Sequence, residues 1–136
     1  MVVYKGIAHA PLCDVMGHMT TRHYVAMFDD ASYHFLYEVF GWSGQQAKTE
    51  GIGWADVRHV IEYHAEVGEG DLVELKASLI KVGNKSITVQ YDMHNLAQNE
   101  LAATLVSTSV YFDLNSRKAM RTTEAMQLAA APYLPS

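Results

Sequence analysis

The longest run of apolar residues at helical spacing lies between Thr20 and Phe40. Apolar residues recur every three or four positions along one face, and others continue round the side. The first set is Tyr24, Met27, Phe28, Ala31, Phe35 and Val39, and the second is Val25, Leu36 and Phe40, with the small polar Ser32 among them. A helix that is apolar on most of its circumference is a buried one. With Thr20 or Thr21 as N-cap and Gly41 as C-terminal stop, we predict a central helix roughly 30 Å long.

Most of the remaining chain has the pattern of β-strands, in segments 2–9, 55–67, 72–82, 86–96 and 101–112. Segment 55–67 alternates, with Val57, His59 and Ile61 on its apolar face, as a half-buried strand does. The apolar positions of segment 72–82 change face near Leu79 and Ile80, which predicts a bulge. Segment 101–112 is apolar at nearly every position, which predicts a central strand covered on both faces.

Turn residues separate these segments and predict how they pair. Gly68-Glu69-Gly70-Asp71 and Gly83-Asn84 are expected to close hairpins, so the last four strands form an antiparallel meander. Residues 41–53 read as a connector with one helical turn, and residues 122–131 as a short terminal helix. We therefore expect one α+β domain over residues 1–136, with a curled five-stranded sheet wrapped around the central helix. Its open edge favours a homodimer, with a homotetramer as the alternative.

Composition narrows the class of protein. The chain has 136 residues, of which 49% are hydrophobic and 18% charged, as in an ordinary globular protein. The net charge of −5 argues against nucleic-acid binding, because phosphate contacts need concentrated Lys and Arg. The single cysteine allows no internal disulfide. No signal-peptide pattern or membrane-spanning apolar run is present, so we expect a cytoplasmic protein without membrane partners.

The loop before the central helix, Asp14-Val15-Met16-Gly17-His18-Met19, is the candidate for chemistry. The first N–H groups of a helix have no partner within it and favour negative charge, including the oxyanion of an attacked carbonyl. Gly17 lets the backbone approach a ligand closely. Asp14 is near enough to attack that carbonyl or to take a proton from water. A carboxylate is a weak nucleophile, so this chemistry favours thioesters, whose thiolate leaves well.

Other interpretations of these residues stay open. Asp14 is alternatively a cap or turn residue with no catalytic role. Asp14, His18 and His23 suggest a metal site, although their spacing matches no zinc helix motif, and we expect no metal and no cofactor. Asp29 and Asp30 fall within the helix, where a buried carboxylate is costly, so at least one must meet solvent or a partner. His59 is read as a core histidine or, alternatively, as a functional one.

The run Asp14-x-x-Gly17-His18-Met19, followed by Tyr24 and by Phe28-Asp29-Asp30-Ala31, resembles the hotdog-fold acyl-CoA thioesterases of the 4-hydroxybenzoyl-CoA thioesterase-like family. Tyr63, Gly70-Asp71, Asn84-Lys85-Ser86 and Asp113 through Arg117-Lys118 resemble later landmarks of that family, so the resemblance covers nearly the whole chain. It implies a hotdog fold that dimerises with the site between subunits. It also implies hydrolysis of an acyl-CoA thioester to free acid and CoA.

The resemblance assigns roles to particular residues. Asp14 would be the catalytic aspartate, and N–H groups near Met19 and Thr20 would hold the carbonyl, with Gly17 and His18 in the same catalytic loop. Substrate-binding residues would be Thr21, Tyr24, His59, Lys81, Lys85, Ser86, Arg117 and Lys118, the basic ones lying on CoA phosphates. His18 stands where many members have a small apolar residue, and the proline that often follows the tyrosine of the second strand is missing after Tyr63. These departures leave the acyl specificity open.

Two other functions are compatible with such a scaffold. A hydratase or dehydratase of acyl thioesters needs a histidine base with an aspartate partner. Asp14 and His18 offer such a pair, although the Asn-Pro element that resembles that group is absent. A non-catalytic acyl-CoA-binding module is the third possibility.

Overall fold

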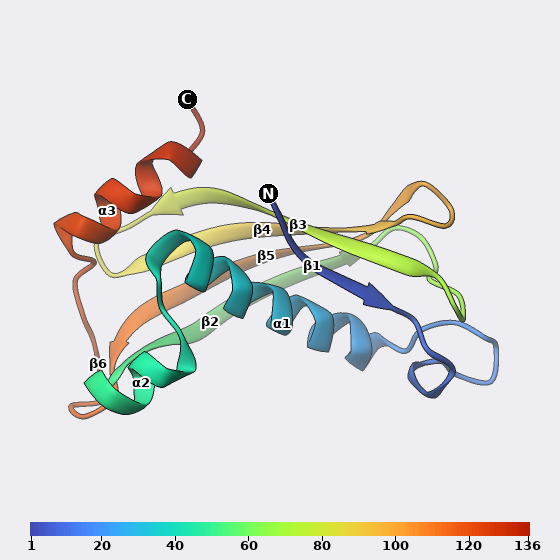
Figure 1. The fold of residues 1–136 in the computed structure, drawn as a ribbon, viewed down its shortest axis with the longest axis horizontal. Helices are drawn as coiled ribbons and strands as arrows, with labels where there is room; N and C mark the ends of the chain where they lie inside the picture. The colour runs from blue at the N-terminus through green and yellow to red at the C-terminus, as the bar shows by residue number, and fades with distance from the viewer.

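A single curved antiparallel sheet forms one layer of the molecule, and a long helix lies across its concave face (Figure 1). The structure, a computed structural model, describes all residues 1–136. The long strands are β1 (Val2–Ile7), β2 (Ile52–Tyr63), β3 (Leu72–Val82), β4 (Ser86–Asn95) and β5 (Glu100–Asp113). The predicted five-stranded sheet is therefore confirmed, with a two-residue strand β6 (Lys118–Ala119) added beside β5.

Helix α1 (Thr21–Phe40) has the predicted bounds. Thr20 occupies the N-cap position, and Gly41 ends the helix in the left-handed conformation at φ 68°. All six residues of the predicted inner face are buried, and Phe35 packs edge-on against Tyr91 of β4 at 6.1 Å between ring centroids. The opposite face is exposed, with Tyr33 and Tyr37 open to solvent. The prediction of burial around most of the circumference is wrong, because the sheet covers the helix from one side only.

Two short helices and two single turns complete the chain. Helix α2 (Gly44–Glu50) lies in the predicted connector, and α3 (Glu124–Ala130) corresponds to the predicted terminal helix. Turns of 3-10 helix occupy Ala10–Leu12 (η1) and Ala131–Tyr133 (η2). Both α2 and α3 lie at the end of the molecule where α1 finishes (Figure 1). No helix combines the length and apolarity needed to cross a bilayer.

The strand order is β1-β3-β4-β5-β2, so only β3, β4 and β5 form a meander. The predicted hairpin between β2 and β3 is wrong: β2 pairs with β5, and the chain crosses from one edge of the sheet to β3 near the other. Gly68 to Asp71 do form a tight turn, in which the Asp71 N–H donates to the Gly68 carbonyl at 3.0 Å, but this turn lies within a crossover and closes no hairpin. Side-chain alternation predicts strands but says nothing about which strand each will join.

The position of each strand in the sheet decides how much of it is covered. Strand β2 is an edge strand, and the register shifts between Asp56 and Arg58. As a result Val57 is 62% exposed, and the predicted half-buried apolar face is not formed. Strand β5 is central as predicted, but its second face is only half-buried. The bulge predicted in β3 is confirmed by a register shift between Leu79 and Lys81.

Candidate active site

The loop between η1 and α1 is closed into a tight turn by its own backbone. The Asp14 N–H donates to the His18 carbonyl at 2.9 Å, and the Gly17 N–H donates to the Asp14 carbonyl at 3.0 Å. Gly17 has φ 80°, a conformation that glycine adopts without steric cost. This turn explains Gly17 better than the predicted approach of backbone to a ligand, since the residue does not line the neighbouring cleft.

The two oxygens of the Asp14 carboxylate have different environments. Oδ1 accepts hydrogen bonds from the N–H groups of Met16 at 2.8 Å and His18 at 3.3 Å, as a turn-capping aspartate does. Oδ2 accepts no hydrogen bond from the chain. One oxygen thus fixes the carboxylate in place, and the other is available to a substrate or a water molecule.

A cleft of about 380 Å³ lies beside this carboxylate. The loop and the start of α1 contribute Asp14, His18, Met19, Thr21 and Tyr24 to its wall. The opposite wall is the end of β2 and the residues after it, with Tyr63, His64 and Glu66. The Tyr24 and Tyr63 rings meet edge to face at 5.2 Å between centroids. The size is within the range of small-molecule sites in proteins, and the wall combines aromatic with polar groups as such sites do.

Backbone N–H groups without a hydrogen-bond partner lie at the start of α1, and they begin at the residue after Met19 and Thr20. The N–H groups of Met19 and Thr20 donate to the carbonyls of Val67 at 2.8 Å and Leu12 at 3.0 Å, so neither is free to hold a carbonyl. The Thr20 hydroxyl makes no cap bond and lies 3.4 Å from the Leu12 carbonyl instead. The N–H groups of Thr21 and Arg22 have no partner in the chain. Thr21 lines the cleft, so its N–H is the candidate donor there.

Histidines on the cleft wall are bonded to groups other than Asp14. His18 Nε2 is 3.0 Å from Glu66 Oε2, and His64 Nε2 is 3.2 Å from the Thr104 hydroxyl. Neither His64 nor Glu66 was predicted from the sequence to belong to the site. Both come beside the loop because His18 forms a bridge with Gly68 and Met19 bonds to Val67. No sequence motif records that long-range pairing, so nothing in the pattern would have found them.

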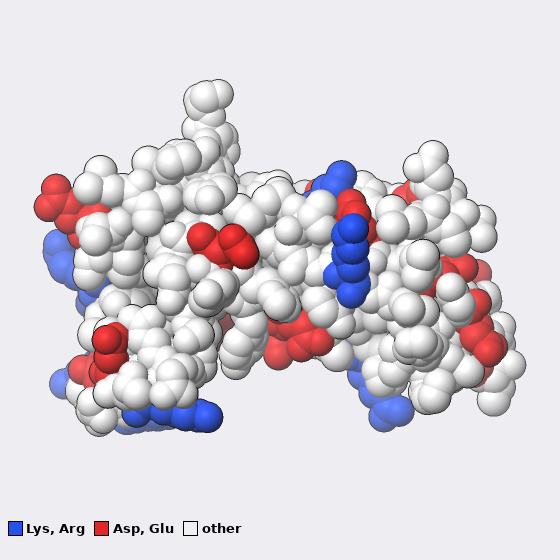
Figure 2. Space-filling view, in the orientation of Figure 1, with Lys and Arg blue, Asp and Glu red and all other residues white.

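The basic residues predicted to hold CoA phosphates do not lie near this cleft. Lys81, Lys85 and Ser86 flank the turn between β3 and β4, and Arg117 and Lys118 belong to the turn between β5 and β6. Both turns are at the left-hand end of Figure 1, and the Asp14 loop is at the right-hand end. Figure 2 shows acidic side chains gathered at that right-hand end. Within one chain, the structure does not bring these five residues and Asp14 together.

His59 is not a core residue. It lies on the edge strand β2 with its side chain 34% exposed, and its Nε2 is 3.5 Å from Asp56 Oδ2. The exposure follows from the edge position of β2 and its bulge. His59 does not line the cleft beside Asp14. Asp29 and Asp30 are both exposed on the open face of α1, as the cost of burying a carboxylate led us to expect.

Asp29 has an unusual electrostatic environment. Partial burial raises the pKa of its carboxyl, and the charges of Asp56 and Asp30 raise it further, while His59 lowers it. Asp56 also accepts a hydrogen bond from the Ser109 hydroxyl at 2.6 Å. The charged form of Asp29 is therefore disfavoured in the folded protein.

We predict that Asp29→Asn increases the free energy of unfolding at pH 7. The pKa of the Asp29 carboxyl is higher in the folded than in the unfolded protein, so the ionised carboxyl destabilises the fold at pH values above the folded pKa. Below the ordinary value of 3.8 the carboxyl is protonated in both the folded and the unfolded protein, and this effect disappears. The gain should shrink as pH falls from 7 towards 4, measured by urea unfolding at each pH. Glu38→Gln on the same helix is the control. A gain that is independent of pH would contradict the electrostatic cause.

The alternative of a metal site finds no support in the geometry. No three His, Cys, Asp or Glu side chains are grouped so that they could hold a metal ion. His23, the third residue of that alternative, has its Nε2 buried without a partner. Its ring does not line the cleft with Asp14 and His18.

Several solved structures have this architecture. A hypothetical protein from Staphylococcus aureus, determined in complex with CoA, is 16% identical with a TM-score of 0.89, over 100% of this chain and 87% of that one. A DHNA-CoA thioesterase from the same organism is 18% identical with a TM-score of 0.83, over 95% of this chain and 87% of the other. A 1,4-dihydroxy-2-naphthoyl-CoA thioesterase from Synechocystis is 18% identical with a TM-score of 0.81, over 94% and 93%.

At these identities the likeness establishes the fold, which is the hotdog fold. A comparison with curated proteins returns no match. The sequence profile of the thioesterase-like superfamily, in contrast, matches residues 10–130, which include the Asp14 loop, α1 and all the long strands except β1. The chain belongs to the thioesterase-like superfamily.

Proposed function

We propose that this protein hydrolyses an acyl-CoA thioester to the free acid and CoA, with Asp14 as the catalytic carboxylate. The observation that carries the proposal is the pairing of a fixed carboxylate with an uncapped helix end on one cleft. Asp14 Oδ2 is without a partner in the chain, and so is the N–H of Thr21 on the same cleft wall. Superfamily membership and the thioesterases among the structural neighbours support the same reaction class.

The chemistry follows from these two groups. The Thr21 N–H, strengthened by the dipole of α1, polarises the thioester carbonyl and stabilises the oxyanion that forms on it. Asp14 Oδ2 takes a proton from a water molecule whose oxygen attacks the carbonyl carbon. The C–S bond then breaks, and the thiolate of CoA leaves and takes up a proton. In the alternative course Oδ2 itself attacks, and water hydrolyses the resulting anhydride.

A second copy of the chain would bring lysine and arginine side chains to the Asp14 cleft, which has none within one copy. The outer edge of β2 has no partner strand, and Val57, Val60 and Tyr63 are exposed on that strand. Twofold antiparallel pairing of two β2 strands covers this edge. It would also bring the first residues of β2 in one copy beside the last residues in the other. Because Ile52 pairs with Asp113, the turn that carries Arg117 and Lys118 would come near the partner's Asp14 cleft.

We predict a homodimer, with twice the chain mass of 15.1 kDa, that Val60→Lys converts to a monomer. A lysine on an edge strand opposes strand-to-strand pairing because its charge must stay in water. Light scattering coupled to gel filtration measures both masses. Leu128→Lys, on exposed α3, is the matched control and should stay dimeric. A monomeric wild-type protein would contradict this assembly.

Arg117→Ala should raise the KM for an acyl-CoA substrate several-fold with little change in kcat. Phosphate contacts bind the ground and transition states alike, and their effect weakens as salt screens them. The same variant assayed on an acyl-pantetheine thioester, which lacks the nucleotide phosphates, should match wild type. Lys85→Ala tests the second predicted turn in the same way. A change confined to kcat would argue against a phosphate contact.

Free-thiol release from a panel of aromatic and aliphatic acyl-CoA substrates tests the function directly and identifies the acyl group. Binding without turnover would favour an acyl-CoA-binding module. Water addition to an enoyl-CoA would favour a hydratase, but the His18 ring is paired with Glu66 rather than with Asp14. That pairing leaves the hydratase without the histidine–aspartate pair it needs.

A further inference from the structure

Three titratable side chains gather on the helix side of the sheet, beside the free edge of β2. Asp56 and His59 of β2 pair with two serines of β5 that are buried on the face covered by α1, so both side chains point to that face. Asp29 of α1 lies near both of them, because the charges of Asp56 and His59 both affect the pKa of its carboxyl. We call Asp29, Asp56 and His59 the edge cluster.

The two carboxylates of the edge cluster are held differently. Asp56 Oδ1 accepts a hydrogen bond from the Ser109 hydroxyl at 2.6 Å, and its Oδ2 is 3.5 Å from His59 Nε2. For Asp29, partial burial raises the pKa of the carboxyl, and the charge of Asp56 raises it further. Asp30, the next residue of the helix, adds to this effect, and only His59 opposes it. Negative charge is therefore in excess at this edge within a single chain.

The titratable groups that face these carboxylates from other strands are tyrosines. Burial raises the pKa of the Tyr91 hydroxyl on β4, and the charges of Asp56 and Asp29 raise it further. On β1, burial raises the pKa of the Tyr4 hydroxyl, and the charge of Asp30 raises it further. Both hydroxyls are therefore neutral between pH 6 and pH 8, and neither changes the charge of the edge cluster in that range.

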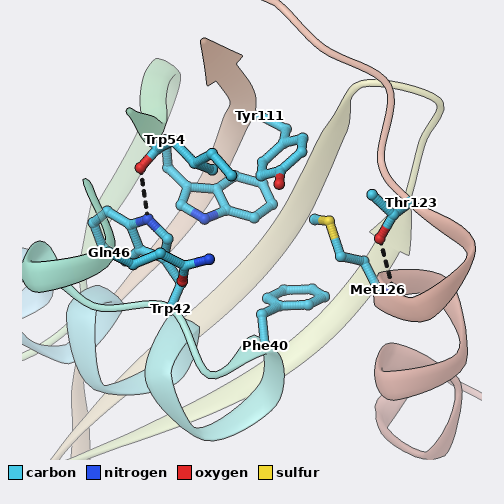
Figure 3. Close-up of a pocket in the computed structure, with 8 residues that line it drawn as sticks. Phe40, Trp42, Gln46, Trp54, Tyr111, Thr123 and Met126 are labelled. Carbon is cyan, nitrogen blue, oxygen red and sulfur yellow. Dashed lines mark hydrogen bonds between the residues drawn. The ribbon is translucent and has the colours of Figure 1, made fainter. Parts of the chain in front are cut away.

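Aromatic packing fixes the start of β2 against α1. The ring of Trp54 lies 5.5 Å from that of Phe40 on α1 and 5.1 Å from that of Tyr111 on β5, measured between centroids (Figure 3). Asp56 follows two residues later on the same face of β2. The edge cluster is therefore held in a defined position between the helix and the free edge of the sheet.

The dimer proposed above would bring two edge clusters together. Pairing that sets the first residues of β2 beside the last residues of the partner's β2 has its twofold axis at the middle of the strand, near Val57 and Arg58. Asp56 and His59 lie on either side of that position. Arg58 points to the other face of the sheet, because its partner on β5 lies on the face away from α1. The exposed Val57 would be buried at the axis, and the exclusion of water strengthens the interactions between charges there.

We propose that pH controls this dimer, because the two edge clusters take up protons when two copies of the chain associate. Each copy brings two carboxylates and one histidine to the axis, so negative charge is in excess at neutral pH and opposes association. Protonation of Asp29 or of His59 lowers that excess, and the dimer tightens as the pH falls. The inference rests on the dimer proposed with the hydrolase function and concerns its assembly.

Sedimentation velocity of the wild-type protein at pH 6, pH 7 and pH 8 measures the Kd of the dimer. Salt at 0.15 M screens charges that are far from the axis. The Kd should fall about tenfold or more from pH 8 to pH 6, because one proton taken up per dimer changes Kd about tenfold per pH unit while its group titrates. Circular dichroism checks that the chain stays folded at each pH. A Kd that is constant, a Kd that rises as the pH falls, or a monomer at every pH would overturn the proposal.

Asp29→Asn separates the edge cluster from the net charge of the chain. It removes one carboxylate per copy from the axis, so it should lower Kd at pH 8 about tenfold and flatten the dependence on pH. Glu38→Gln removes the same charge from an exposed position about half a turn round the helix from Asp29, and its Kd should match wild type at each pH. Equal shifts of Kd in the two variants would show that net charge alone acts, and would overturn the proposal.

His59→Gln tests the basic member of the edge cluster. It should raise Kd at pH 6 more than at pH 8, because only the protonated ring offsets the carboxylates. A pH dependence that persists unchanged in both Asp29→Asn and His59→Gln would contradict the role of the cluster. Thiol release from acyl-CoA, measured at protein concentrations well above Kd, tests the hydrolysis separately. A dimer that hydrolyses acyl-CoA but has a pH-independent Kd would overturn this inference alone.

Discussion

Asp14→Asn is expected to lower kcat for thioester hydrolysis by at least about 100-fold, the scale of a positioned acid–base group. The amide keeps an oxygen in the place of Oδ1, so the hydrogen bonds from Met16 and His18, and with them the turn, should persist. What the variant loses is the basic oxygen at Oδ2. Thermal unfolding should therefore change little while turnover, measured by thiol release, nearly disappears.

Asp113→Asn is the matched control for this variant. Asp113 Oδ1 also accepts two N–H groups of its own turn, those of Asn115 at 2.8 Å and Ser116 at 3.2 Å. Those bonds lower the pKa of the Asp113 carboxyl, so the control tests the loss of a charged turn cap outside the Asp14 loop. Its kcat should match wild type. Equal kcat in both variants would remove Asp14 from the mechanism.

A labelling experiment distinguishes the two roles of Asp14. In a single turnover in H₂¹⁸O, a general base directs the labelled oxygen into the product acid. A nucleophilic carboxylate gives an anhydride, and water attack at the Asp14 side of it leaves the label on the protein. Mass spectrometry of the peptide that contains Asp14 reads out the difference.

The second large effect is expected from Thr21→Pro, which should reduce kcat about 100-fold by removing one oxyanion donor. Thr21 is the first residue of α1, a position where proline is well tolerated because its N–H has no helical partner. Thr20 has φ −74° and ψ 152°, a conformation that a following proline accepts. The helix should therefore form normally, and circular dichroism checks that it does.

Two further variants isolate the N–H. Thr21→Ala removes the side chain but keeps the donor, so its kcat should stay close to wild type. Glu124→Pro makes the same change at the first residue of α3, where Thr123 has a similar conformation, φ −78° and ψ 160°. It should also keep wild-type kcat. A Thr21→Pro enzyme that is folded and fully active would exclude this N–H as the donor that polarises the carbonyl.

The sequence predicted where in the chain the site lies better than it predicted the hydrogen bonds and neighbours of the site residues. Asp14, His18, Met19, Thr21 and Tyr24 lie close together in the chain, and the structure brings all five to one cleft. N–H groups near Met19 and Thr20 were predicted to hold the carbonyl, but those of Met19 and Thr20 themselves are bonded to carbonyls of other segments. His64 and Glu66 follow the end of β2, and local spacing carries no information about which distant segment meets a loop.

The predicted phosphate-binding residues show that local spacing also carries no information about contacts between two copies of the chain. Resemblance places Lys85 and Arg117 beside CoA, yet both lie at the opposite end of the chain's own fold from Asp14 (Figure 1). Only an assembly of two copies would reconcile them with one site. Contact between these basic residues and CoA at the other copy's Asp14 cleft depends on the symmetry of the assembly, which the residue spacing within one chain does not encode.

By itself the sequence determined the elements whose signals are local. The 3.6-residue period and a terminal glycine defined α1, and alternation with turn residues defined the strands, because these patterns depend on a few neighbouring positions. Tertiary structure alone decided that β2 joins β5 at the edge and that the helix end stays uncapped beside Asp14. Those outcomes depend on hydrogen bonds between residues tens of positions apart, such as Met19 with Val67, and such pairings are selected only when the whole sheet closes over its core.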